Sequence, residues 1–453
     1  MCNIIIKNFP WIKFLLATAI LFAVLVVAAC TKKDNEIKGL AYDPPGSTIT
    51  TDKEITPQLK RTYHFNNTDL HLSNEFEGAR LNDFYQVNDS VYTALISPEN
   101  APINNSAWYA FKIWADDQQD ITLNLIYNDG THRYIPKISN DGIEWTAFDT
   151  TLIEIDTSKK FASLKLSIGQ DTLWFSAQEL ITSSVYERWE DEIAELPYVD
   201  KKVIGASSEG RSINELMISE SANSNDYLIF IGRQHPPEVT GFFALKSFVE
   251  TIAGSSEICS EFRKRFNVVV IPLVNPDGVD NGHWRHNIHG VDLNRDWVNF
   301  NQAEPKVVKD EVNKIVSTGG NIIFYIDFHS TQKDVFYILS LESTIDENST
   351  ESDKRKAEEN YSLMKEWLTN LQNKLPDYHV AIIDTLSKIS SPTSDRWIQK
   401  TFNAPAVTYE VGDETDRELI KKVAANAAEE LMKLLLSVKG KNKVPLQEQR
   451  DFE

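Results

Sequence analysis

Apolar and polar positions follow two different patterns along the chain. Between residues 61 and 185 the sequence carries short alternating runs, among them AWYAFKIWA, ITLNLIY and LIEIDT, separated by turn sequences such as YNDGTH and SNDGIE. Alternation with a period of two is typical of strands that bury one face. The repeated strand-and-turn pattern predicts an antiparallel β-sandwich over residues 61–185.

From residue 186 onward, apolar strands alternate with helical segments. The predicted strands are YLIFIG, FNVVVIPLV, IIFYIDFH, YHVAIID and APAVTYEVG, and helices are expected over 238–252, 303–316, 355–373 and 414–437. This order predicts an α/β domain over residues 186–437, with a mixed, mostly parallel sheet flanked by helices. The all-β sandwich would precede this domain, and residues 438–453 would form a polar C-terminal tail.

The N-terminal residues have the pattern of a targeting segment. Lys7 and Lys13 precede the apolar run FLLATAILFAVLVVAA, which ends in small residues before Cys30. This arrangement is typical of a lipoprotein signal peptide over residues 1–29, whose removal would leave Cys30 for lipidation; a retained helical anchor is the alternative. We therefore expect a lipid anchor in a bacterial membrane, on the periplasmic or surface side of the outer membrane. The polar residues 30–60 would be a flexible tether.

Charge, cysteine count and length bear on the partners, the disulfides and the number of domains. The formal net charge of −20 disfavours nucleic acid as a partner. After loss of Cys2 and lipidation of Cys30, Cys259 is the last cysteine in the chain, so no intramolecular disulfide is expected. A mature length of about 420 residues exceeds what one core usually serves, which supports two domains.

Polar side chains collect at the ends of the predicted strands. His235 and Glu238 follow YLIFIG, His329 ends IIFYIDFH, and Glu410 lies in APAVTYEVG. A histidine and a glutamate three positions apart occur often by chance, so HPPE alone decides nothing. Two imidazoles and one carboxylate nevertheless suit zinc and leave a fourth position open for water. Glu410 would then be the general base that takes a proton from that water.

The chain from about residue 190 to 437 resembles the zinc carboxypeptidase family, of which carboxypeptidase A is the familiar member. The resemblance rests on six motifs in order: IGASSEGRSI, HPPE, NPDG, HWRHNIHGVDLNRDW, DFHS and TYEVG. HPPE and the preceding sandwich are most similar to the cytosolic carboxypeptidase branch. The resemblance implies a zinc metallocarboxypeptidase that hydrolyses the C-terminal peptide bond of peptides and binds one Zn²⁺ per chain.

The same resemblance implies roles for individual residues. His235, Glu238 and His329 would hold the zinc ion, Glu410 would activate the zinc-bound water, and Asp292 would orient His235 by accepting a hydrogen bond from its ring. Zinc would hold the water at the position the three ligands leave open.

The substrate side of the site is implied in the same way. Arg285 would polarise the scissile carbonyl and stabilise the oxyanion, and Asn294 and Arg295 would grip the free C-terminal carboxylate of a peptide. A gapless count places Asp395 where relatives that prefer basic C-terminal residues carry an acid. Asp395 would favour removal of C-terminal Lys or Arg, whereas a slip of one position would bring in Arg396 and favour acidic ends. Ser394 and Asp395 could instead have a purely structural role as helix N-cap residues.

The chain differs from the family pattern at some positions, and other functions stay open. Pro237 stands where many members have arginine, so one carboxylate contact is missing, and no mobile tyrosine is evident before Glu410. His283, His286 and His289 lie in a glycine-containing loop, where their spacing gives no common face, so we reject a second metal site. A peptidoglycan stem-peptide hydrolase, an amino-acid deacylase and an inactive surface-binding lipoprotein stay open as alternative functions.

Overall fold

The computed structural model describes residues 44–441 except 222, 346–347 and 386–391. All of these described residues belong to one compact unit. The predicted signal peptide and Cys30 lie outside the described residues. Among the residues that the structure describes, no helix is both long enough and apolar enough to cross a membrane.

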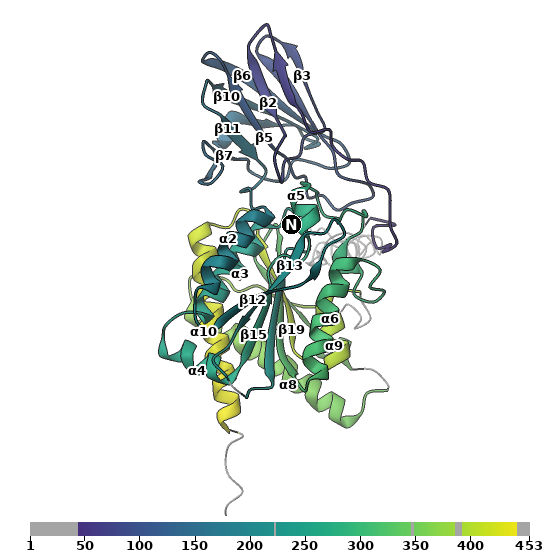
Figure 1. Ribbon diagram of the computed structural model, residues 1–453, viewed down its shortest axis with the longest axis vertical. Coiled ribbons are helices and arrows are strands. Elements are labelled where there is room, and N and C mark those ends of the chain that lie inside the picture. Colours follow the sequence, from purple (N-terminus) through teal and green to yellow (C-terminus); the bar gives the residue numbers. More distant parts are fainter. Residues whose placement is uncertain (1–43, 222, 346–347, 386–391, 442–453) are drawn as a thin grey trace, which may run out of the picture. The chain divides into compact units, whose positions relative to one another are not determined.

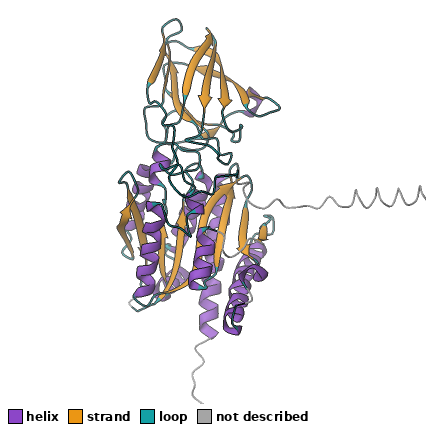
Figure 2. Ribbon diagram, turned by 90° about the vertical axis from the view of Figure 1, so that its right-hand side faces the viewer, coloured by secondary structure: helices purple, strands orange, loops and turns teal. Residues whose placement is uncertain are grey.

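Residues 62–176 form the β-rich region, which contains two sheets (Figure 2). The first has the order β1-β2-β5-β11-β7-β8, with β1 Thr62–Phe65, β2 Leu70–Ser73, β5 Ala110–Ala115, β11 Leu173–Ser176, β7 Lys137–Ser139 and β8 Thr146–Ala147. The second has the order β3-β4-β6-β10-β9, with β3 Asp83–Asn88, β4 Val91–Ile96, β6 Gln119–Tyr127, β10 Phe161–Ile168 and β9 Ile153–Ile155. A short 3-10 helix, η1, spans Thr150–Leu152.

Alternating burial explains why these strands form. In β6 and β10 every second side chain is buried, and these side chains join one apolar cluster with those of β2 and β5. The predicted β-rich region is confirmed. One pairing differs from the expected antiparallel pattern, because β4 and β6 run parallel.

An eight-stranded sheet of order β12-β13-β15-β14-β16-β19-β17-β18 organises the rest of the chain. Its strands are β12 Val199–Ala206, β13 Ser212–Ile218, β14 Asp226–Gly232, β15 Asn267–Ile271, β16 Asn321–Thr331, β17 Val335–Leu339, β18 Ile382–Thr385 and β19 Ala406–Gly412. The central strands β15, β14, β16 and β19 are parallel, whereas β12, β13 and β17 join antiparallel. The sheet is therefore mixed, as predicted.

Helices cover both faces of this sheet (Figure 1). The helices are α2 Ser183–Ala194, α3 Val239–Ile252, α4 Glu257–Arg265, α5 Pro276–Asp280, α6 Ala303–Ser317, α7 Leu341–Thr344, α8 Glu351–Lys374, α9 Ser394–Phe402 and α10 Arg417–Lys441, with the 3-10 helix η2 at Leu293–Arg295. One apolar cluster joins α2, α3, α4, α8 and α10 to the sheet and contains Cys259, and a second joins α6 and α9 to the opposite face. The expected α/β class is confirmed.

Residues 44–61 contain no regular element, but their backbone is held by hydrogen bonds. Lys53 N donates to His289 O at 2.8 Å, and Thr56 N donates to Glu99 O at 2.6 Å. Gln302 Nε2 donates to Thr50 O at 2.9 Å. The described part of the predicted tether therefore lies against the residues that follow α5. The predicted domain boundaries stay a prediction.

Candidate active site

The ends of β14, β16 and β19 bring four of the predicted site residues together. His235 follows β14, and Glu238 occupies the N-cap of α3. His329 lies near the end of β16, and its register partner on the parallel strand β19 is Glu410. Parallel strands present their C-terminal ends at one edge of a sheet, which explains why these side chains meet.

His235, Glu238 and His329 form a compact group, called the ligand group below, that could hold one metal ion. One ligand atom from each lies within 4.8 Å of the other two, and all three residues are buried. His235 Nδ1 is 2.8 Å from Glu238 Oε1, and His329 Nδ1 is 2.7 Å from Glu238 Oε2. Two imidazole nitrogens and a carboxylate facing one point form a donor set that suits zinc. In the part of the chain that the structure describes, no other such group occurs.

The opposite nitrogen of each imidazole contacts a buried carboxylate. His235 Nε2 is 3.0 Å from Asp292 Oδ1, the arrangement expected from the sequence. His329 Nε2 is 2.9 Å from Asp327 Oδ2, a contact that the sequence interpretation missed. The sequence did contain a signal for this contact. Asp327 precedes His329 by two positions on a strand, so the two side chains lie on the same face. Each carboxylate fixes a ring so that Nδ1 is available to a metal.

The charges in the site are those of a cation-binding pocket. Burial alone would lower the pKa of His329, but Asp327 and Glu238 outweigh it and raise that pKa well above its ordinary value. Burial would raise the pKa of Glu238, but His235 and His329 outweigh it and hold that pKa far below its ordinary value. Together these groups concentrate negative charge around two imidazoles, which a divalent cation would balance.

Glu410 has a different environment from that of the three ligand residues. Burial is the largest cause that raises its pKa to about 7; the charge of Glu238 also raises it, while His329, His235 and Arg285 oppose the increase. Its Oε2 atom is buried and has no hydrogen-bond partner among the residues that the structure describes. A carboxylate with a pKa near neutrality and an unused oxygen is suited to accept and return a proton.

The N-terminus of α3 presents Glu238 to the two histidines. Glu238 stands at the N-cap position, yet its side chain makes no capping hydrogen bond. Behind it, Gly241 N donates to Ser330 Oγ at 2.7 Å, and a Cβ at Gly241 would lie 2.8 Å from His329 O. The glycine therefore permits a close approach of α3 to β16 that aligns Glu238 with His329.

Arg285 lies beside the ligand group, as expected. Its Nε donates to Asp292 Oδ2 at 2.7 Å, and its Nη1 is 3.9 Å from Glu238 Oε1. Burial would raise the pKa of Asp292, but Arg285, His235 and Arg295 together hold that pKa well below its ordinary value. Asp292 thus joins His235 to Arg285 through its two oxygens.

Asn294 and Arg295 lie on η2 next to the ligand group. Asn294 Nδ2 is 3.3 Å from His329 Nε2, and Asn294 Oδ1 accepts a hydrogen bond from Ser394 N at 3.0 Å. Arg295 is half-buried, and its Nη1 donates to Asn294 O at 2.8 Å. Asn294 therefore links β16 to α9, and the substrate-binding role of both residues stays a prediction.

Asp395 and Arg396 lie in the first turn of α9 and form an ion pair. Arg396 Nη1 donates to Asp395 Oδ2 at 2.7 Å, and Thr393 Oγ1 donates to Asp395 Oδ1 at 2.6 Å. Thr408 Oγ1 also donates to Asp395 Oδ2 at 3.2 Å. Because Thr408 precedes Glu410 by two positions on β19, the pair lies on the Glu410 face of the sheet.

The three histidines of the loop after α5 contact different partners. His283 Nδ1 is 3.0 Å from His286 O, His286 Nδ1 is 2.6 Å from Asn100 Oδ1, and His289 Nδ1 is 3.4 Å from Asp52 Oδ2. Burial lowers the pKa of His286 to about 4, so this imidazole is neutral at pH 7. The contacts of His286 and His289 connect the loop to Asn100 and Asp52.

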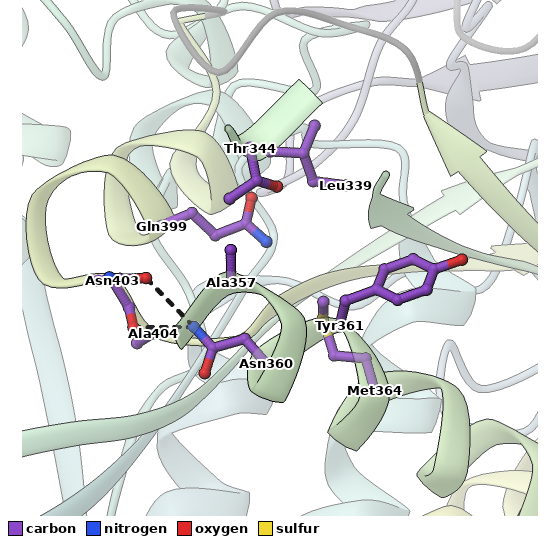
Figure 3. Close-up of a pocket in the computed structure, with 9 residues that line it drawn as sticks. All are labelled: Leu339, Thr344, Ala357, Asn360, Tyr361, Met364, Gln399, Asn403 and Ala404. Carbon is purple, nitrogen blue, oxygen red and sulfur yellow. Dashed lines mark hydrogen bonds between the residues drawn. The ribbon is translucent and has the colours of Figure 1, made fainter. Parts of the chain in front are cut away.

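A small pocket lies apart from the ligand group, between β17, α8 and α9 (Figure 3). Its lining residues are Leu339, Thr344, Ala357, Asn360, Tyr361, Met364, Gln399, Asn403 and Ala404. Asn360 Nδ2 donates to Asn403 O at 2.9 Å, a hydrogen bond between two of these lining residues. Among the described residues that line it there is no carboxylate, imidazole or thiol.

A known protein family matches the part of the chain that contains this site. The model of the zinc carboxypeptidase family matches residues 186–430, more than half of the chain. Mouse cytosolic carboxypeptidase 4 is 32% identical over 132 residues, which are 28% of this chain and 12% of that protein. Mouse cytosolic carboxypeptidase 6 is 24% identical over 282 residues, 56% of this chain and 52% of that protein. The matches thus span about an eighth and about half of these two relatives.

Solved structures share the fold over a larger part of the chain. A metallo-carboxypeptidase from Burkholderia cenocepacia superimposes with a TM-score of 0.66 at 17% identity, covering 82% of this chain and 99% of its own. A metallo-carboxypeptidase from Pseudomonas aeruginosa, in complex with (2-guanidinoethylmercapto)succinic acid, gives a TM-score of 0.65 at 16% identity, covering 81% and 99%. At these identities the likeness concerns the fold.

Proposed function

Because the chain belongs to the zinc carboxypeptidase family, we propose that it is a zinc-dependent metallocarboxypeptidase that hydrolyses the C-terminal peptide bond of peptides. The observation that carries the proposal is the convergence of His235, Glu238 and His329 at strand ends, with Glu410 on the neighbouring strand. Binding alone would not need a carboxylate held near neutrality beside the ligand group.

The three ligand residues would hold one zinc ion, which when bound supplies a Lewis acid that polarises water and the substrate carbonyl. Glu410 would accept a proton from the attacking water at Oε2 while the hydroxide oxygen bonds to the carbonyl carbon. The same oxygen would then return the proton to the amide nitrogen as the C–N bond breaks. The products are a shortened peptide carboxylate and a free amino acid.

Arg285 would stabilise the negative charge that develops on the carbonyl oxygen. Its guanidinium is held in place by Asp292, so little reorganisation is needed when that charge forms. A planar, permanently charged group suits this position better than a flexible ammonium. Asp292 therefore orients both the ring of His235 and the side chain of Arg285.

Arg295 and Asn294 would bind the free C-terminal carboxylate of the substrate. Charge-assisted hydrogen bonds from a guanidinium to a carboxylate give both affinity and direction. Arg295 is half-buried at the end of η2, which gives it access to a ligand and a partly desolvated environment. This carboxylate requirement would make the enzyme an exopeptidase.

Paired peptides test the proposal directly. The purified, zinc-loaded protein should release the last residue of peptides with a free C-terminal carboxylate and leave the matching C-terminal amides intact, as measured by mass spectrometry. Glu410→Gln should retain zinc and lower kcat by on the order of 10²–10⁴. Cleavage of amides and acids at equal rates would instead favour endopeptidase or acylase action. Near-normal turnover of the variant would remove Glu410 from the mechanism.

We propose further that the mature protein is a lipoprotein attached to a bacterial membrane through Cys30. The support is the sequence pattern around residues 1–30, in which two lysines, an apolar run and small residues precede the cysteine. Its substrates would then be peptides outside the cytoplasm.

A further inference from the structure

Glu99, in the loop between β4 and β5, is fully buried and binds three consecutive backbone amides of the loop that carries Arg285. Trp284 N donates to Glu99 Oε2 at 2.7 Å. Arg285 N and His286 N donate to Glu99 Oε1 at 3.1 and 2.7 Å. Successive amides that converge on one carboxylate form a concave anion site, which fixes the backbone on either side of Arg285.

Neighbouring contacts hold the same loop against the β-rich region. The Trp284 side chain belongs to the apolar cluster of that region, and its Nε1 donates to Trp108 O at 2.9 Å. Asn100, next to Glu99, has its Oδ1 2.6 Å from His286 Nδ1 and donates through Nδ2 to Gly290 O at 3.1 Å. Glu99 and Asn100 therefore hold the loop at residues 284–286 and at Gly290, although they precede it by nearly 200 positions in the sequence.

The electrostatic environment keeps Glu99 ionised. Burial would raise its pKa, but His283, His286, Arg80 and the amide of Trp284 outweigh burial and lower the pKa to about 2. At pH 7 the His286 imidazole is neutral, so the buried Arg80 and the three amides are the groups that balance the carboxylate. Replacing the carboxylate would leave buried N–H groups without an acceptor.

We infer that Glu99 is a positioning residue for Arg285, and that the β-rich region thereby forms part of the catalytic scaffold. This inference rests on the proposed function. Glu99 fixes the main chain of Arg285 and Asp292 fixes its side chain, so the guanidinium is held from both ends. The expected role is to raise kcat, because a guanidinium aimed at the developing oxyanion acts mainly in the transition state.

A double-mutant cycle tests this role. In Glu99→Gln the side chain keeps its size. Its new NH2 group, however, is a donor and cannot accept a hydrogen bond from the backbone N–H that it faces. We expect this variant to lower kcat at least tenfold per zinc-loaded molecule, with little change in KM. In an Arg285→Ala background the same replacement should change kcat by less than twofold, because the two residues act as a unit. Additive losses in kcat, or an unchanged kcat in the single variant, would overturn the inference.

Lys137→Gln is the matched control. Lys137 also belongs to the β-rich region and pairs with Glu414 at 2.8 Å, but it contacts no residue of the Arg285 loop among those described. The kcat of the Lys137→Gln variant should equal that of the wild type. If Glu99→Gln does not accumulate as folded protein, Glu99→Asp, which keeps the charge and shortens the reach, takes its place in the same cycle with the same expected coupling.

Amide hydrogen exchange separates this inference from the proposed function. In Glu99→Gln the amides of Trp284, Arg285 and His286 should exchange at least tenfold faster than in the wild type and in Lys137→Gln, whether or not any peptide is cleaved. Unchanged protection of these amides would contradict the anchor itself. A wild-type protein that cleaves no peptide while the amides lose protection in the variant would overturn the proposed activity and the catalytic role of Glu99, but not the anchor.

Discussion

His329 on β16 and Glu410 on β19 are register partners in a parallel pair of strands, so their side chains leave the sheet side by side and on one face. The neighbouring register pair, two positions earlier, joins Asp327 to Thr408 on the same face. A single strand pairing therefore places all four of these side chains on one face of the sheet. A shift of that pairing by one residue would turn the ligand and the general base to opposite faces.

The ligand group predicts a defined metal stoichiometry. The wild type should bind about one zinc ion per chain, and His235→Ala or His329→Ala should abolish tight binding, because two ligands rarely retain zinc against a chelator. Asp327→Asn keeps all ligands but weakens the acceptor behind His329, so its zinc affinity should fall by about 10–100-fold. Elemental analysis and chelator competition measure both effects. Undiminished zinc in the two alanine variants would show that the metal lies elsewhere.

The contact between α3 and β16 predicts a large effect from one methyl group. Gly241→Ala would place a Cβ 2.8 Å from His329 O, so the helix or the strand must move. We expect a loss of about 1–3 kcal/mol in the free energy of unfolding, together with weaker zinc binding. Ser247→Ala, in the same helix but bonded to Lys421 O, provides the control and should bind zinc normally. Denaturant unfolding and zinc titration would detect the difference, and equal behaviour of both variants would contradict the predicted strain.

The elements that carry the ligands were predictable because their signals are local. The strand YLIFIG corresponds to β14 and the helix 238–252 to α3, while IIFYIDFH and APAVTYEVG correspond to β16 and β19. Each is a buried apolar run or a helical repeat that can be recognised within about ten residues. The motif order then indicated which strand ends meet.

Features that depend on distant partners were not predictable in the same way. Strand β12 pairs with β13 but leaves most of its side chains partly or fully exposed, so it lacks an apolar run. The parallel pairing of β4 with β6 depends on which strands neighbour one another and not on either sequence. Glu99 resembles an ordinary loop acid until folding brings the amides of residues 284–286 to it.

The proposed lipid anchor predicts the cellular fraction of the protein. Cys30→Ser removes the thiol that would carry the lipid, so the variant should move from the membrane fraction to the soluble fraction or accumulate as unprocessed precursor. Metabolic labelling with a fatty acid should mark the wild type and not the variant. Labelling and membrane association that are unchanged in Cys30→Ser would contradict the lipoprotein prediction.

The ion pair beside Glu410 predicts which C-terminal residue is preferred. The Asp395 carboxylate pairs with Arg396 and accepts a hydrogen bond from Thr408 on the Glu410 face of the sheet. The zinc carboxypeptidase resemblance places an acid at this position in relatives that prefer basic C-terminal residues. We expect faster cleavage of peptides that end in Lys than of peptides that end in Glu. Asp395→Asn should lower the Lys-to-Glu rate ratio at least tenfold, since Arg396 would lose its carboxylate partner. Three peptides differing only in a terminal Lys, Glu or Phe measure this ratio. A ratio that Asp395→Asn leaves unchanged would make both residues structural parts of α9.

The buried His132 predicts a loss of stability in mild acid. Burial and the charge of Lys159 lower its pKa from 6.5 to about 4, and its Nδ1 lies 2.8 Å from the Tyr127 hydroxyl. Between these two pKa values the unfolded chain binds a proton that the folded protein does not, so stability is full above pH 6.5 and falls as the pH decreases toward 4. The loss from this residue should be on the order of 3 kcal/mol.

His132→Gln isolates that contribution from the acid loss of zinc, which affects both proteins. The variant should be less stable than the wild type at pH 8, because it loses the packing of the imidazole. The difference between the two free energies of unfolding should then shrink or reverse at pH 4.5, where the wild type must protonate a buried ring or unfold. Urea titrations at pH 8, 6 and 4.5 give this difference directly. A difference that stays constant over that range would mean that His132 titrates in the folded protein as it does in the unfolded chain.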